Sequence, residues 1–150
     1  MRSWMPFVLL TVLSWGTYIP TLHKGQLALG NSGLHAFMMV GVAYLLVAIL
    51  IPGTIIARAG TWHLFTSGGM ALTLAAGALG AVGALGISFA LVNGGRPSVV
   101  PPLVFAGAPV VSTFVAMAYN PPQNSPSLTF YLGIVMAAAG AGLVLANRPT

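Results

Sequence analysis

The sequence contains no aspartate, no glutamate and no cysteine among its 150 residues. Without carboxylates the chain cannot perform acid–base catalysis through acidic side chains, build a Ser-His-Asp triad or hold a carboxylate-ligated metal ion. Without thiols it can form neither disulfides nor thiolate metal sites, so the redox compartment is not indicated. We therefore expect that the protein is not an enzyme and needs no cofactor.

Charge of either sign is scarce. Only 3% of the residues are charged, 57% are hydrophobic and the mean hydropathy is +0.96, whereas about a quarter of a soluble domain is usually charged. This composition predicts an integral membrane protein. The five cations stand singly in the chain, at Arg2, Lys24, Arg58, Arg96 and Arg148. Because they form no patch of the kind that binds phosphates, we expect no nucleic-acid partner.

Five apolar segments are long enough, at roughly 20 residues, to cross a bilayer. The predicted helices cover residues 5–22, 34–56, 68–93, 98–119 and 128–146. A secretory signal is the alternative for the first segment, but Trp15, Tyr18 and Pro20 occupy the place of a cleavage site. We predict an all-α, polytopic membrane helix bundle that forms one domain over residues 1–150. An odd number of crossings would place the termini on opposite sides of the membrane.

Glycine and proline mark the third and fourth segments. Four glycines recur at every third position of the third segment, at Gly77, Gly80, Gly83 and Gly86. Small residues let neighbouring helix backbones approach in lipid, so we expect this helix to be central and Gly80→Leu to block assembly. The fourth segment contains Pro101, Pro102 and Pro109, which free backbone groups that only protein or a water-lined cavity can satisfy. The two segments together indicate a cavity wall.

Several stretches resemble a known family. They are Trp15 and Gly16 in the first segment, GISFALVNGG followed by RPSVVPPLVFAGAPVVSTF, and LGIVMAAAGAGLVL in the last segment. In this order they look like one five-helix repeat of the drug/metabolite transporter superfamily, in its EamA-like branch. The resemblance implies one half of a ten-helix inverted-repeat transporter that moves small metabolites across the cytoplasmic membrane. The family often has an acidic residue between its fourth and fifth helices, whereas residues 120–127 of this chain carry no charge.

The cations do not set an orientation. Arg2 and Arg58 would lie on the side of the N-terminus, and Lys24, Arg96 and Arg148 on the other. The positive-inside rule needs a clear asymmetry, and two against three gives none. Insertion in both directions would let two chains pair as inverted repeats do. We therefore expect a homodimer or a paired half-transporter, with the lipid bilayer and a neutral or anionic small molecule as its partners.

Polar and aromatic side chains form stripes on the predicted helices. In the first segment Thr11, Ser14, Trp15 and Tyr18 follow the i, i+3, i+4, i+7 pattern of one helix face. The predicted substrate-binding residues are Trp15, Thr17, Tyr18, Lys24, Tyr44, Ser88, Asn93, Pro109, Ser112 and Thr113. Such a site would be uncharged, with aromatic walls. In the alternative interpretation, the hydroxyls bond neighbouring helices and the aromatic rings lie at the membrane interface.

Isolated basic side chains admit two interpretations. Lys24 and Arg96 could attract an anionic headgroup or substrate, or they could be boundary anchors. His23, His35 and His63 have no ligand spacing and are expected to be interfacial or capping residues rather than metal ligands. Two functions remain open: a small-molecule transporter subunit, and a non-transporting scaffold or accessory subunit whose glycine faces dock partner helices.

Overall fold

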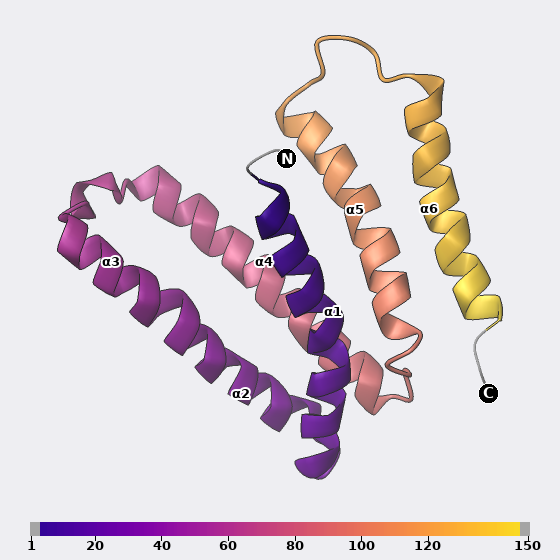
Figure 1. Cartoon of the computed structure of the whole chain (residues 1–150), viewed down its shortest axis with the longest axis horizontal. Helices are drawn as coiled ribbons and strands as arrows, with labels where there is room; N and C mark the ends of the chain where they lie inside the picture. Colours follow the sequence, from indigo (N-terminus) through magenta and orange to yellow (C-terminus); the bar gives the residue numbers. More distant parts are fainter. Residues whose placement is uncertain (1–3, 148–150) are drawn as a thin grey trace. The chain divides into compact units, whose positions relative to one another are not determined.

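A computed structural model describes residues 4–147, and all regular structure within this range is helical. Five stretches are long and apolar enough to cross a membrane (Figure 1). They are α1 (Met5–Ala28), the continuous helix α2–η1–α3 (Gly33–Ala59), α4 (Ser67–Val92), α5 (Val100–Tyr119) and α6 (Leu128–Ala146). The predicted five spans are confirmed, and the chain is a multi-pass membrane protein. The flanking cations Arg2 and Arg148 lie outside the described residues.

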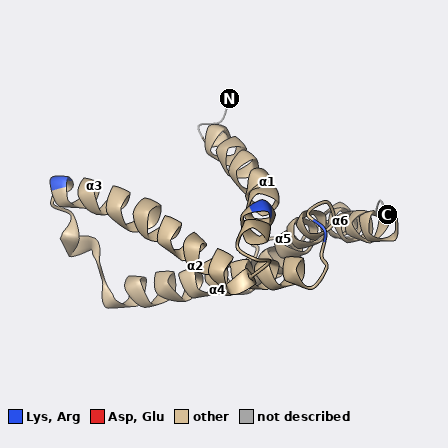
Figure 2. Cartoon of the chain, turned by 90° about the horizontal axis from the view of Figure 1, so that it is seen from below, with Lys and Arg blue, Asp and Glu red and all other residues tan. Residues whose placement is uncertain are grey.

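The helices group into two compact units, which meet in sequence between Gly94 and Gly95. The first unit contains α1 to α4, and the second contains α5 and α6. Within the first unit the cations Lys24 and Arg58 lie apart from each other, with Arg58 in the last turn of α3 (Figure 2). The single domain over residues 1–150 and the inverted-repeat architecture stay predictions.

Helix α1 is longer than predicted. It continues to Ala28 instead of ending at residue 22, so Lys24 and Gly25 belong to the helix and not to a link. Leu22 and, within the extension, Gln26 are buried, and this packing offsets the low helix propensity of glycine. The chain turns only afterwards, at Gly30 with φ 69° and Asn31 with φ 57°. Glycine and asparagine adopt this left-handed conformation most readily.

The second span also extends past its predicted end at residue 56. Its middle part, η1 (Leu45–Leu50), is a π-helix and directly precedes α3 (Ile51–Ala59). Pro52 has no N–H and its ring would collide with the carbonyl four residues earlier in a regular helix. The wider π turn accommodates this clash, so Pro52 neither ends nor breaks the span. The helix stops at Gly60, whose φ of 65° makes a left-handed C-cap.

A short segment joins α3 to α4. It contains the 3-10 turn η2 (Trp62–Leu64), and the ring of Trp62 stacks on Phe65 with centroids 5.9 Å apart. Aromatic side chains of this kind are favoured at the membrane–water interface. The side chain of Thr66 then caps α4 by accepting a hydrogen bond from the Gly69 N–H at 3.2 Å. The composition of the segment is therefore suited to the membrane–water interface.

The core of the first unit is a three-helix junction. It forms where the C-terminal halves of α1 and α4 meet the start of α2. Its buried residues are Ile19, Leu22, Gln26, Gly33, Ala36, Ile87, Ser88 and Leu91. Farther from the junction, α3 and α4 separate toward the turn that joins them (Figures 1 and 2). The first unit is thus held together mainly at one end.

The close approach at this junction comes from Gly33. A Cβ atom on Gly33 would lie 3.1 Å from Val92 Cγ2 and 3.3 Å from the carbonyl oxygen of Ser88. The glycine repeat of α4 behaves differently, because a Cβ on Gly77, Gly80, Gly83 or Gly86 would meet nothing within 4 Å. The expectation that these four glycines bring helices together is therefore wrong for contacts within the first unit. Helix α4 packs through its larger residues near Ser88.

The second unit is a helical hairpin. Helix α5 starts two residues later than predicted, and Pro101 and Pro102 lie in its first turn, where a missing N–H costs nothing. Pro109 lies inside the helix, and the Thr113 hydroxyl donates a hydrogen bond to its carbonyl oxygen at 2.8 Å. Helix α6 begins at a cap in which Ser127 Oγ accepts from the Phe130 N–H at 3.3 Å. The two helices pack against each other.

Replacing Gly33 by leucine should destabilise the first unit. The side chain cannot fit between α2 and α4 without moving Val92 or the Ser88 backbone, and overpacking of this kind costs about 1–3 kcal/mol. Thermal unfolding of the purified protein in detergent measures the loss. Gly16→Leu on α1 is the matched control, because a Cβ there meets nothing within 4 Å. Equal unfolding temperatures for the two variants would contradict the close approach at Gly33.

Candidate binding grooves

A groove of about 420 Å³ lies between α1 and α2. Its α1 wall carries four hydroxyl-bearing side chains, Ser14, Thr17, Tyr18 and Thr21. These residues follow the i, i+3, i+4, i+7 pattern, so they share one face of the helix. The facing wall of α2 is apolar and consists of Ala36, Met39, Val40 and Ala43. We call this space the α1–α2 groove.

The hydroxyls of the α1–α2 groove differ in their hydrogen bonding. Thr17 Oγ1 donates to the Leu13 carbonyl at 2.9 Å, and Thr21 Oγ1 donates to the Thr17 carbonyl at 2.8 Å. Each threonine oxygen keeps lone pairs that can accept a bond from a ligand. The Tyr18 hydroxyl is buried and has no partner within residues 4–147. The groove therefore offers several acceptors and one unpaired phenol.

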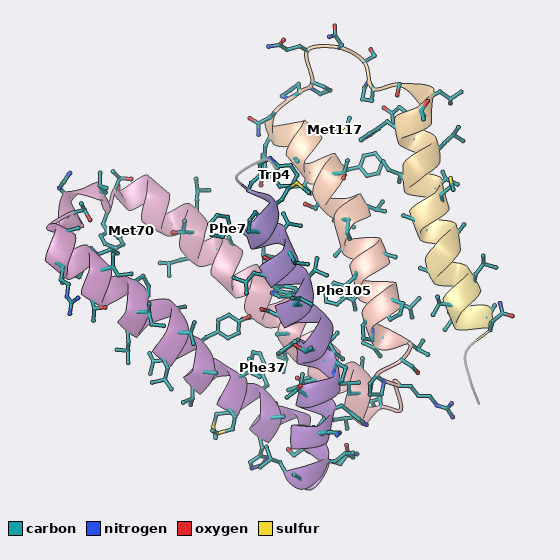
Figure 3. The ribbon with its side chains drawn as sticks, in the orientation of Figure 1. Trp4, Phe7, Phe37, Met70, Phe105 and Met117 are labelled. Atoms are coloured by element: carbon teal, nitrogen blue, oxygen red, sulfur yellow. The ribbon has the colours of Figure 1, made fainter. Side chains whose placement is uncertain are left out.

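A second groove, of about 310 Å³, lies between α2 and α4. Its walls are Phe37, Val40, Gly41 and Tyr44 from α2, and Gly77, Gly80, Ala81 and Ala84 from α4. Phe37 lies on the side of α2 that faces α4 (Figure 3). The missing side chains of Gly77 and Gly80 leave this space open. We call it the α2–α4 groove, and Val40 lines both grooves.

The predicted site residues do not form one cluster. Thr17 and Tyr18 line the α1–α2 groove, and Tyr44 lines the α2–α4 groove. Trp15 and Lys24 lie on α1 but line neither groove.

The remaining predicted residues are not among those that line the two grooves. Ser88 is fully buried in the three-helix junction, and its hydroxyl donates to the Ala84 carbonyl at 3.1 Å. Asn93 follows the last turn of α4, where its side-chain amide donates to the Phe89 carbonyl at 2.8 Å. Pro109, Ser112 and Thr113 belong to α5 in the second unit. Ser88 and Asn93 thus have structural partners in their own helix.

The predicted polar face of the first helix and the observed α1 wall of the α1–α2 groove share only Ser14 and Tyr18. Thr11 and Trp15 belong to the predicted stripe and do not line the groove, whereas Thr17 and Thr21 do. Thr21 is missing from the predicted site, although it lies inside the predicted first helix. Its spacing of four residues from Thr17 and three from Tyr18 is the signal that identifies it.

Two further polar atoms on α1 are buried without a hydrogen-bond partner in the described part of the chain. They are Nδ1 of His23 and Oε1 of Gln26. Gln26 is fully buried, and its Nε2 donates to the Ser88 carbonyl over a long 3.5 Å. The sequence places Gln26 in a polar link, so burial of this side chain was not predicted.

The other two histidines have different environments. His35 lies in the first turn of α2, and its Nδ1 is 2.6 Å from Ser32 Oγ, the side chain that caps this helix. His63 is exposed in η2, outside the membrane-spanning helices. Within residues 4–147 no group of three or more potential metal ligands occurs.

Cysteine substitution should show whether the α1–α2 groove holds water. The sequence has no cysteine, so a single introduced thiol is the only one in the protein. A thiol reacts as its thiolate, which forms in water but not in lipid. We expect Thr21→Cys to react with a membrane-impermeant maleimide roughly tenfold faster than Thr73→Cys. Thr73 is exposed on α4, outside both grooves, so equal rates would mean that the groove contains lipid.

Comparison with protein-family models, with curated proteins and with solved structures gives no match for this chain. The resemblance to the drug/metabolite transporter superfamily therefore stays a prediction, and functional assignment depends on the geometry and chemistry of the grooves.

Proposed function

We propose that the protein is a subunit of a small-molecule transporter of the cytoplasmic membrane. The observation that carries this proposal is the α1–α2 groove, with the unpaired Tyr18 hydroxyl buried in its wall. Polar groups within membrane spans are uncommon, and they usually face a bundle interior or a water-filled cavity. The volume of about 420 Å³ lies within the range of ligand pockets in proteins.

The groove chemistry favours a neutral substrate over an anionic one. No charged side chain lines either groove, and Lys24 is exposed elsewhere on α1. A charged solute in such a site would lose its hydration without gaining an ionic partner. A molecule with hydroxyl or N–H donors could instead bond the threonine oxygens and the Tyr18 hydroxyl.

The transporter would work as a pair. In the most apolar window of each span, at most 11% of the positions are buried within the chain. The grooves therefore need further helices to enclose a solute. We propose that a second copy in the opposite orientation, or a separate second repeat, supplies these helices. The nearly balanced cations on the two sides of the membrane are compatible with this pairing.

An accessory or scaffold role is the second candidate. The observation that favours it is the open space at Gly83 and Gly86 of α4, where an added Cβ meets nothing within 4 Å. Small residues of this kind let helices of other proteins approach closely in lipid. A scaffold would assemble with partners but would transport no solute by itself.

Uptake into proteoliposomes tests the transporter proposal. A suitable panel of neutral solutes is radiolabelled glycerol, glucose, uridine and nicotinamide, because each carries hydrogen-bond donors. For the transported solute, Tyr18→Phe should raise KM about tenfold by removing one hydrogen bond in a buried site.

Thr21→Val should also weaken uptake, because it removes an acceptor from the groove. Thr73→Val is the matched control, since Thr73 Oγ1 makes the same type of bond to the Gly69 carbonyl at 2.8 Å but lies outside the grooves. Absence of uptake for every solute, with the protein assembled normally, would favour the scaffold role.

A further inference from the structure

Helix α1 contains a proline in its interior, at position 20. Pro20 has no N–H, so the regular hydrogen bond to the Gly16 carbonyl cannot form, and the proline ring crowds the same carbonyl. The nearby threonine hydroxyls bond other carbonyls, because Thr17 Oγ1 donates to Leu13 and Thr21 Oγ1 donates to Thr17. Gly16 also has no side chain that would restrict its backbone. Helix α1 is therefore weakened between Gly16 and Pro20.

The two halves of α1 on either side of this point are held differently. Next to Pro20 and beyond it, the helix is anchored in the three-helix junction, where Ile19, Leu22 and Gln26 are buried. Before it, residues 4–17 are all exposed. One half of α1 is thus fixed, and the other half is free to move about Pro20.

The α1–α2 groove extends across this weak point. Ser14 and Thr17 line the groove before Pro20, and Thr21 lines it afterwards. The opposing wall is held at its start by the contact of Gly33 with α4. A bend at Pro20 therefore moves one end of the α1 wall and leaves the rest of the groove in place.

The position of Pro20 also sets the direction of the bend. Tyr18 and Leu22 line the groove, and each is two residues from Pro20, which corresponds to about 200° around the helix. Pro20 thus lies on the side of α1 nearly opposite these two residues. Because the ring forces the helix open on its own side, a proline bends a helix toward the other side. Bending at Pro20 carries the N-terminal half of α1 toward α2.

We propose that residues 4–17 form a gate that closes over the α1–α2 groove by bending at Pro20, an inference that rests on the proposed transport function. In the bent form Ser14 approaches the α2 wall near Ala43 and covers a bound solute. In the straight form this end of the groove is open. Ser14 lies about 9 Å from Pro20 along the helix, so a bend of about 20° moves it by about 3 Å.

Spin labels measure this movement in the purified protein in lipid nanodiscs. The sequence has no cysteine, so Ser14→Cys combined with Ala43→Cys places one label on the gate and one on α2. Electron–electron resonance should give two distances, about 3 Å apart. Pro20→Ala restores the N–H and is more favourable inside a helix, so it should leave only the longer distance. Pro109→Ala, which removes the interior proline of α5, is the matched control and should keep both distances.

A second pair of labels tests the fixed half of α1. Gly25→Cys combined with Met39→Cys labels groove positions beyond Pro20 and should give one distance, with or without Pro20→Ala. Two distances for this pair would mean that α1 moves as a whole, and would overturn the hinge. A single distance between the labels at positions 14 and 43, or two distances that persist in Pro20→Ala, would overturn it equally.

Uptake into proteoliposomes separates the gate from the transporter proposal. For the solute that the unmodified protein transports, Pro20→Ala should lower the initial rate severalfold, because the groove can no longer close over the solute. An unchanged rate in Pro20→Ala would overturn the gate and leave the transporter proposal intact. Two label distances without uptake of any solute would reject the transporter proposal, while the hinge at Pro20 would stand.

Discussion

The contact between α2 and α4 at Gly33 is the constraint on which the first unit depends. Because Gly33 has no side chain, the start of α2 lies directly against the Ser88 backbone and Val92. Helix α1 completes this junction with Ile19, Leu22 and Gln26. The junction thereby sets the separation of the three helices, and the two grooves occupy the space on either side of α2.

Lipid explains why so little else is buried. Apolar side chains gain nothing by leaving lipid for another helix, so long apolar helices need few mutual contacts. Polar side chains must be satisfied locally instead, and threonine hydroxyls bond the carbonyl four residues earlier, as in Thr11 to Phe7 and Thr73 to Gly69. Against this background of local pairing, the Tyr18 hydroxyl, His23 Nδ1 and Gln26 Oε1 are exceptions, because they are buried without a hydrogen-bond partner in the described residues.

The sequence predicts what depends on local composition and misses what depends on neighbours. Hydropathy is a local property, so the third predicted span, residues 68–93, matches α4 (Ser67–Val92) closely. The end of α1 depends on burial of Leu22 and Gln26 by other helices, which no local pattern reveals. Spacing likewise identifies the small face of α4, but only the structure shows that Gly33 makes the close contact. Thr17, Tyr18 and Tyr44 were predicted for a site and line the grooves. Thr21 also lines a groove but was not predicted.

The two grooves are mechanically linked because α2 is a wall of both. Val40 lines each of them, so a movement of α2 toward α1 narrows one groove and widens the other. The α2 end at Gly33 is held by α4, while the π-helical segment Leu45–Leu50 and Pro52 interrupt the regular helix beyond the grooves. Interruptions of this kind are where long helices bend. The α2 residues that line the grooves lie between the contact at Gly33 and this interruption, so the junction with α4 fixes the wall that the two grooves share.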